Sequence, residues 1–78
     1  FPNPVTDILH LNVALEKPSQ LDFAIINTLS QEVFFYSTTT TGTTASFEFP
    51  VDFLNQGIYF LTMYNGINKP ITKKFMKK

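Results

Sequence analysis

Apolar and polar residues alternate along most of this chain in short runs, with the two-residue period that is typical of β-strands. Between the runs lie Pro, Gly, Asn and Thr, which favour turns, and apolar residues nowhere recur at helical spacing for more than one turn. The segments that follow the strand pattern are 8–15, 21–26, 33–37, 45–49, 57–64 and 71–77. We therefore expect an all-β fold, an immunoglobulin-like antiparallel β-sandwich of about six or seven short strands.

The third of these segments differs from the others because Phe34, Phe35 and Tyr36 place apolar groups on both of its faces. Strands with two apolar faces are usually central in a sheet, so we expect a central position for this strand. The tract Thr38–Thr44, which Gly42 interrupts, is flexible enough to form a loop between the third and fourth strands, although Thr favours strand conformation, and the sequence leaves open whether the tract is ordered.

The last two segments have the pattern of a hairpin. Gly57 begins the first arm, and the side chains of Tyr59, Leu61 and Met63 share one face. The dipeptide Asn65–Gly66 tolerates the positive φ of a type I′ hairpin turn. Pro70 lacks an amide donor, which costs little on an edge strand, so the return arm 71–77 is predicted to lie at the edge of a sheet.

Positive charge is concentrated at the end of the chain, although the net charge is zero. Arg is absent, all acidic residues precede position 53, and the last ten positions contain five of the six basic residues: Lys69, Lys73, Lys74, Lys77 and Lys78. Zero net charge without Arg argues against general nucleic-acid binding. A cationic last strand indicates either a segment that a partner recognises or an edge that Lys protects against aggregation, and the charge pattern alone favours neither.

The chain has 78 residues, of which 44% are apolar and 15% aromatic, and it contains no Cys. A domain of this size supplies only about 3–5 kcal/mol from its core, so the core must be dense. Neither a disulfide nor a zinc site of the Cys type can form, and no cofactor is expected. No apolar run approaches the roughly 20 residues of a membrane span. Because the chain begins at Phe1 without Met, we expect it to be part of a longer secreted precursor.

Catalytic chemistry is not indicated by these residues. His10 is the only histidine, and beside Asn12 on the second face of its strand it is expected to be a partly exposed surface residue. The six carboxylates stand singly among strands and turns, and no activated nucleophile has its sequence signature. We expect the chain not to be an enzyme.

The aromatic residues leave one alternative function open. If Phe34, Tyr36, Phe60 and Tyr64 faced outward together, they would form a stacking platform for sugars, as in a carbohydrate-binding or adhesion module of a secreted enzyme. Residues of this kind belong more often to a core that is buried from both sides.

Three stretches, in this order and spacing, resemble the type A C-terminal sorting domain of cargo that is exported by the type IX secretion system of Bacteroidetes. They are Phe1-Pro-Asn-Pro-Val-Thr-Asp, Leu54-Asn-Gln-Gly-Ile-Tyr and Lys74-Phe-Met-Lys. The segment 25–33 is also similar to the family, except that Ser30 stands where the family usually has Gly. If this position requires a positive φ, Ser30 carries backbone strain of about 1 kcal/mol, or else the turn differs in type from that of the family.

The resemblance implies a single sorting domain, residues 1–78, with no catalysis of its own, at the end of a longer exported protein. The precursor would pass through the periplasm, where the type IX translocon recognises the domain and exports the cargo to the outer membrane surface or the extracellular space. A surface sortase would then cleave ahead of the domain. An edge strand also offers a pairing surface to a second copy, so weak homodimerisation stays open.

The residues that match the family's motifs are Pro2, Asn3, Pro4, Gly57, Tyr59, Lys74, Phe75 and Lys77. By this resemblance, the final strand is the recognition element, and the glycine and tyrosine hold its hairpin partner in place. The proline-rich start would mark the point where a flexible linker becomes folded domain.

Overall fold

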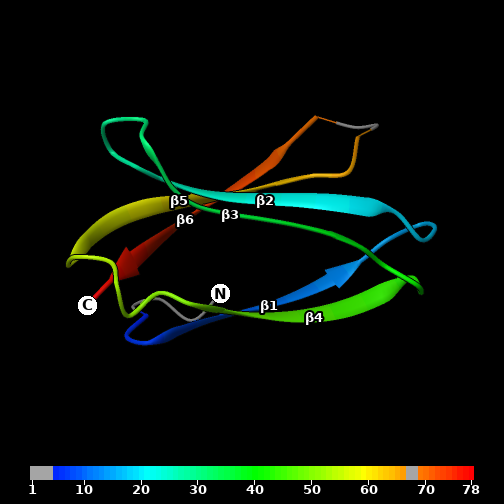
Figure 1. Ribbon diagram of the computed structural model, residues 1–78, viewed down its shortest axis with the longest axis horizontal. Helices are drawn as coiled ribbons and strands as arrows, with labels where there is room; N and C mark the ends of the chain where they lie inside the picture. The colour runs from blue at the N-terminus through cyan, green and yellow to red at the C-terminus, as the bar shows by residue number, and fades with distance from the viewer. Residues whose placement is uncertain (1–4, 67–68) are drawn as a thin grey trace.

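The computed structural model describes residues 5–66 and 69–78. These residues form a two-layer β-sandwich (Figure 1). The strands are β1 (Ile8–Ala14), β2 (Gln20–Asn27), β3 (Glu32–Thr39), β4 (Thr44–Pro50), β5 (Gly57–Tyr64) and β6 (Ile71–Lys77). All strand pairs are antiparallel, and the described residues contain no helix. The expected all-β, immunoglobulin-like sandwich is confirmed, with six strands.

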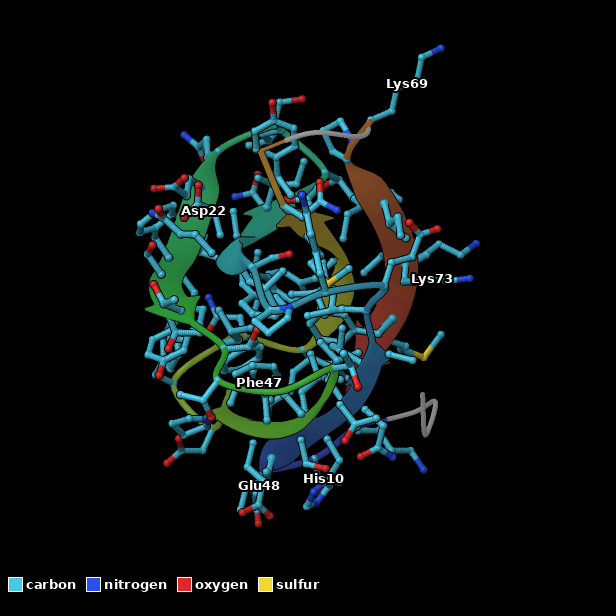
Figure 2. All side chains as sticks on the ribbon, turned by 90° about the vertical axis from the view of Figure 1, so that its right-hand side faces the viewer. His10, Asp22, Phe47, Glu48, Lys69 and Lys73 are labelled. Carbon is cyan, nitrogen blue, oxygen red and sulfur yellow. The ribbon has the colours of Figure 1, made fainter. Side chains whose placement is uncertain are left out.

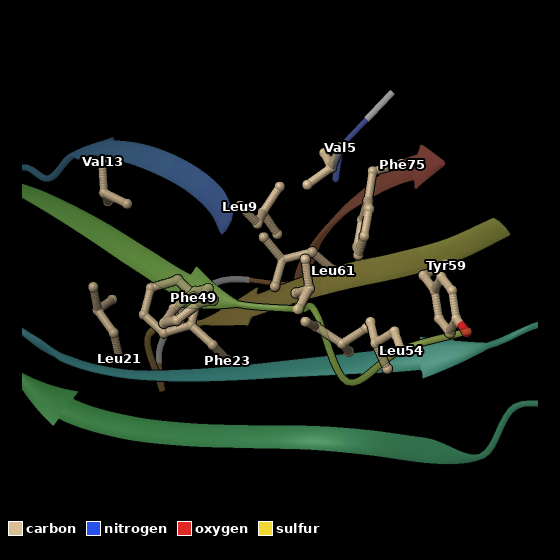
Figure 3. Close-up of a cluster of buried hydrophobic side chains, with 12 residues drawn as sticks. Val5, Leu9, Val13, Leu21, Phe23, Phe49, Leu54, Tyr59, Leu61 and Phe75 are labelled. Carbon is tan, nitrogen blue, oxygen red and sulfur yellow. The ribbon is translucent and has the colours of Figure 1, made fainter. Parts of the chain in front are cut away.

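The strands form one sheet of two strands, β1-β4, and one of four, in the order β3-β2-β5-β6. Figure 1 shows the smaller sheet facing the larger one along its length. The alternation in β2 explains why the core lies between them, since Leu21, Phe23 and Ile25 are fully buried on its inner face. From the opposite sheet, Leu9 and Phe49 close the core (Figure 3).

Aromatic contacts join the two sheets on the side of β3 and β4. The ring of Phe23 lies 4.8 Å from that of Phe47 and 5.1 Å from that of Phe49, and Phe34 lies 5.3 Å from Phe49. Aromatic pairs at such distances contribute about 0.5–1.5 kcal/mol each beyond the burial of their area. This cluster gives a chain without disulfides the dense core that its size requires.

The prediction that the third strand is central is wrong, because β3 is an edge strand that pairs only with β2 among the described residues. Its two apolar faces have different roles. Tyr36 and Phe34 face inward and pack against Phe49 of β4, whereas Phe35 faces outward and is 55% exposed. The inner face of this edge strand is apolar because it packs against the opposite sheet, whereas its outer face is apolar although it is exposed to solvent.

The threonine tract is shorter as a loop than the sequence predicts, because Thr38 and Thr39 belong to β3 and Thr44 begins β4. Thr40 connects the remaining loop, residues 40–43, to the β1–β2 connection through hydrogen bonds. Its hydroxyl accepts a hydrogen bond from the Ser19 amide at 2.9 Å and donates one to the Ser19 carbonyl at 3.1 Å. The Thr40 amide also donates to this carbonyl, at 2.9 Å. These contacts fix the loop at its first residue.

The β2–β3 turn is built on Asn27, whose side-chain oxygen accepts hydrogen bonds from the amides of Leu29 and Gln31 at 2.9 and 3.0 Å. The Ser30 amide donates to the Asn27 carbonyl at 3.1 Å. Ser30 has φ of 62°, the only positive φ of a non-glycine residue among those described. The sequence predicts strain at Ser30 if its φ is positive, and this φ is positive in the structure.

Replacing Ser30 with glycine is expected to stabilise the domain. Glycine removes the strain of about 1 kcal/mol that a side chain bears in the left-handed region, and part of this gain is offset by its larger unfolded-state entropy. The expected net gain in the free energy of unfolding is about 0.5 kcal/mol, or about 2–4 °C in Tm. Urea and thermal unfolding would measure it. Ser30→Ala keeps the strain and serves as the control, and a glycine variant less stable than wild type would contradict this account.

The β5–β6 hairpin is present, but its turn is longer than a two-residue type I′ turn. The connection comprises residues 65–70, of which 67 and 68 lie outside the described residues. Gly66 does have a positive φ of 84°, as the dipeptide Asn65–Gly66 led us to expect. Pro70 directly precedes β6, which is confirmed as an edge strand of the larger sheet.

Candidate functional site

The candidate recognition strand β6 pairs with β5 along its whole length, from Ile71 opposite Met63 to Lys77 opposite Gly57. Because successive side chains of a strand point to opposite faces, the odd-numbered residues of β6 turn toward the smaller sheet and the even-numbered ones outward. This alternation, together with how far the smaller sheet covers β6, decides which lysines a partner can reach.

Phe75 is the inward anchor of the strand. It is fully buried and lies opposite Tyr59 in the register of the sheet. The two rings are stacked, with centroids 5.8 Å apart and planes at 25° (Figure 3). Phe75 therefore cannot touch a partner while the domain is folded, and it acts by holding β6 in the sheet.

Tyr59 links the hairpin to the connection that leads from β4. Its side chain is 8% exposed, and its hydroxyl donates a hydrogen bond to the Asn55 carbonyl at 2.8 Å. In the same connection, Leu54 is buried and its amide donates to the carbonyl of Val51 at 3.0 Å. The motif around Tyr59 thus supports β5, the neighbour of β6.

Gly57 begins β5 with φ of 156°, a conformation that side chains rarely adopt, although a Cβ there would meet only Tyr59 Cε2 at 4.0 Å. Gly57→Ala is expected to destabilise the domain by about 1–3 kcal/mol through the backbone alone. Gly42→Ala is the matched control, because Gly42 has no positive φ and open space around it. It should leave stability unchanged or raise it by about 0.4–1 kcal/mol. Equal losses for both variants in urea unfolding would contradict this interpretation.

The lysines of the matched motif occupy different environments. Lys74 points outward from β6, opposite Phe60, and is exposed. Lys77 is only 7% exposed, and its Nζ donates a hydrogen bond to the Lys78 carbonyl at 3.0 Å. Among the matched residues of β6, Lys74 is thus the one whose charge faces solvent.

The end of β6 is covered by the chain that leads into β1. Val5 is buried and forms a parallel bridge with Lys77. Its amide donates to the Met76 carbonyl and its carbonyl accepts from the Lys78 amide, each at 2.8 Å. The predicted linker residues Pro2, Asn3 and Pro4 lie outside the described residues, just ahead of this bridge.

Ile71 and Lys73 are exposed residues of β6 that were not among those that the sequence singled out for the site. Both are odd-numbered and so belong to the inward face, yet Ile71 is 52% exposed and Lys73 is also exposed. The smaller sheet has only two strands, so it does not cover the start of β6. The alternation in the sequence places both residues on the inward face. Their exposure to solvent could not be predicted from it, because it depends on the width of the opposite sheet.

Charge is divided between the two sides of the sandwich. Asp22, Glu32 and Glu48 belong to β2, β3 and β4, whereas β1, β5 and β6 contain no acidic residue. In Figure 2, Asp22 and Lys73 lie on opposite sides of the molecule. The β6 side therefore presents a cationic surface without a neighbouring carboxylate on the strands that form it.

No catalytic arrangement was found in the part of the chain that is described. His10 lies on the surface, as expected, with Nδ1 3.2 Å from a Glu48 carboxylate oxygen, and both side chains are more than half exposed (Figure 2). Exposed pairs of this kind contribute little to stability. The described residues hold no group of three metal-ligating side chains and no helix that is long and apolar enough to span a membrane.

The four aromatic residues considered for a sugar platform do not share a face. Phe34 and Tyr36 turn inward against β4, whereas Phe60 and Tyr64 lie on the outer face of the larger sheet. Phe34 packs against the core as a partly buried residue, whereas Tyr36 is 41% exposed. This geometry excludes a single stacking platform made of all four.

Comparison with known protein families identifies a match for this chain. The family described as "Secretion system C-terminal sorting domain" matches residues 1–78, the whole chain. None of the curated proteins matches this chain. The family match covers all three stretches of the earlier resemblance and the complete sandwich.

Proposed function

This chain belongs to the family of secretion-system C-terminal sorting domains, the sorting signals of type IX secretion, and we propose that the translocon recognises it as a folded domain through β6. Members of this family direct export across the outer membrane to the surface or the extracellular space. In this proposal the domain has no catalytic activity and serves as the sorting signal of a cargo that precedes it in the chain.

The observation that carries the proposal is that some side chains of β6 are buried in the core whereas others are exposed to solvent. Phe75 and Lys77 are buried, while Lys74, directly before Phe75, projects into solvent. A strand whose alternate side chains are locked in a core presents its exposed charge in a fixed position, which lowers the entropic cost of binding. A partner would thus recognise the charge of Lys74 in the geometry of the sheet.

The proposal includes the fate of the precursor. Residues 1–78 form one domain after the cargo, and Pro2, Asn3 and Pro4 mark the change from linker to domain. The precursor passes through the periplasm, is exported by the translocon, and is cleaved ahead of the domain by a surface sortase. The cargo is then released or attached to anionic lipopolysaccharide.

An export assay tests this function. A fluorescent carrier with a signal peptide is fused through a flexible linker to residues 1–78, and a matched carrier ends at the linker. Both are expressed in a bacterium with a working type IX system and in a strain that lacks it. Fluorescence at the surface or in the medium is expected only for the complete fusion in the working strain. A folded fusion that stays in the periplasm would overturn the proposal.

The alternative function is a carbohydrate-binding or adhesion module. It is disfavoured because the outer aromatic residues Phe60 and Tyr64 lack the aromatic neighbours Phe34 and Tyr36 that such a platform would use. Titration of the domain with soluble glycans, followed by tyrosine fluorescence, tests it. Saturable quenching together with failed export would favour this alternative.

A further inference from the structure

One side of the sandwich is bounded by two open strand edges. β1 pairs only with β4, and β6 pairs only with β5 and, at Lys77, with Val5 among the described residues. The bridge to Val5 occupies the last part of β6, so the stretch from Ile71 to Phe75 has no described strand on its second edge. Open edges present backbone donors and acceptors to an added strand.

Between these edges lies a groove of about 220 Å³, which we call the β1–β6 groove. The residues that matter for its chemistry are Leu11, Val13, Leu61, Met63, Ile71 and Lys73. Val13 and Leu61 are buried and form its floor, whereas Ile71 is half exposed at its rim. The groove has room for an apolar side chain that enters from outside.

Among the described residues that line the groove, Lys73 is the only charged one. The three strands that supply the described lining, β1, β5 and β6, contain no Asp or Glu, so the lysine has no acidic neighbour on them. Figure 2 shows Lys73 projecting from β6 on the side of the molecule away from Asp22. Charge complementarity therefore favours an occupant with a carboxylate at this place.

The spacing along β6 defines the occupant more closely. Ile71 and Lys73 are two residues apart and point to the same face, as do residues i and i+2 of any strand paired beside them. An added strand would thus place an apolar side chain near Ile71 and a carboxylate near Lys73, with one residue between them. The bridge of Val5 to Lys77 shows that this edge of β6 accepts backbone pairing.

We propose that the β1–β6 groove binds an extended acidic segment of the secretion machinery, which adds as a strand to Ile71–Phe75 and carries an apolar residue and a carboxylate at positions i and i+2. This inference rests on the proposed function for the origin of the segment. The binding chemistry itself depends only on the groove.

A labelled peptide of repeating Glu-Thr-Val-Thr, which places Glu and Val on one face, is the probe. Fluorescence anisotropy with the complete chain is expected to show saturable binding that weakens at least about tenfold in Lys73→Glu, because a like charge replaces the complementary one. Ile71→Thr, at an exposed position, should also weaken it. Lys69→Glu makes the same change of charge outside the groove and should bind as wild type does. Amide chemical shifts are expected to change at 11–14 and 71–75.

Several results would overturn the proposal: no binding, equal binding by Lys73→Glu, chemical shift changes confined to β3 or to the outer face, or sedimentation showing that a second copy of the chain occupies the groove. The export assay separates this inference from the proposed function. If the Lys73→Glu fusion is exported like wild type, the groove is not used in sorting and the inference fails, while the sorting function stands. If the wild-type fusion is not exported although the peptide binds at the groove, the function fails and the binding site stands.

Discussion

Replacing Phe75 with alanine is expected to leave the domain largely unfolded at growth temperature. Phe75 is fully buried and stacks on Tyr59, so its truncation removes transfer free energy and leaves a cavity. Substitutions of this kind cost about 3–5 kcal/mol. The loss equals most of the stability that a core of this size supplies, about 3–5 kcal/mol. Thermal unfolding followed by near-UV circular dichroism would measure the loss.

Two control variants isolate the effect of burial at Phe75. Phe75→Leu keeps an apolar side chain and should remain folded with a smaller loss. Lys74→Ala changes the adjacent, exposed position and should alter stability by about 0.5 kcal/mol or less. If Phe75→Ala unfolds at the temperature of wild type, Phe75 is not the anchor of β6 and the account of this strand is wrong.

Phe23→Ala is expected to destabilise the domain by a similar amount, about 3–5 kcal/mol, from the other end of the core. Phe23 is fully buried in β2 and contacts the rings of Phe47, Phe49 and Tyr36. Its truncation removes the centre of the aromatic cluster that joins the sheets. Urea unfolding measures the loss, and Phe23→Leu, expected to stay folded, is the control.

The same variant distinguishes recognition of a fold from recognition of a linear motif. Phe23→Ala leaves residues 71–78 unchanged but removes the sheet that orients them. If the translocon requires folded β6, a carrier fused to Phe23→Ala should be retained in the periplasm, and Phe23→Leu should restore export. Normal export of an unfolded Phe23→Ala fusion would show that the C-terminal sequence alone is sufficient.

The strand pattern and the edge position of β6 could be predicted from the sequence because they depend on local rules. Alternation located all six strands to within a few residues, and Pro70 correctly indicated an edge. The resemblance at the two ends and at Gly57–Tyr59 led to the family that the match then confirmed. The family's usual glycine suggested either a positive φ at Ser30 or a different type of turn, and the structure has the positive φ.

Other features depend on contacts between distant segments, which alternation does not encode. The edge position of β3 follows from its packing against β4, and the order of the threonine tract from hydrogen bonds between Thr40 and Ser19. Likewise, charge alone does not distinguish exposed Lys74 from buried Lys77. That difference arises because Phe75 and Lys77 share the face that Val5 and the smaller sheet cover.

The most direct test of the central claim is the export of a carrier fused to the domain with Lys74→Glu. This change reverses the exposed charge of β6 and should alter the free energy of unfolding by no more than about 0.5 kcal/mol. Lys69→Glu, which makes the same change in the preceding connection, is the control (Figure 2). We expect Lys74→Glu to fold normally and to reduce export about tenfold or more, with Lys69→Glu exported like wild type. Wild-type export of a folded Lys74→Glu fusion would contradict recognition through the exposed face of β6.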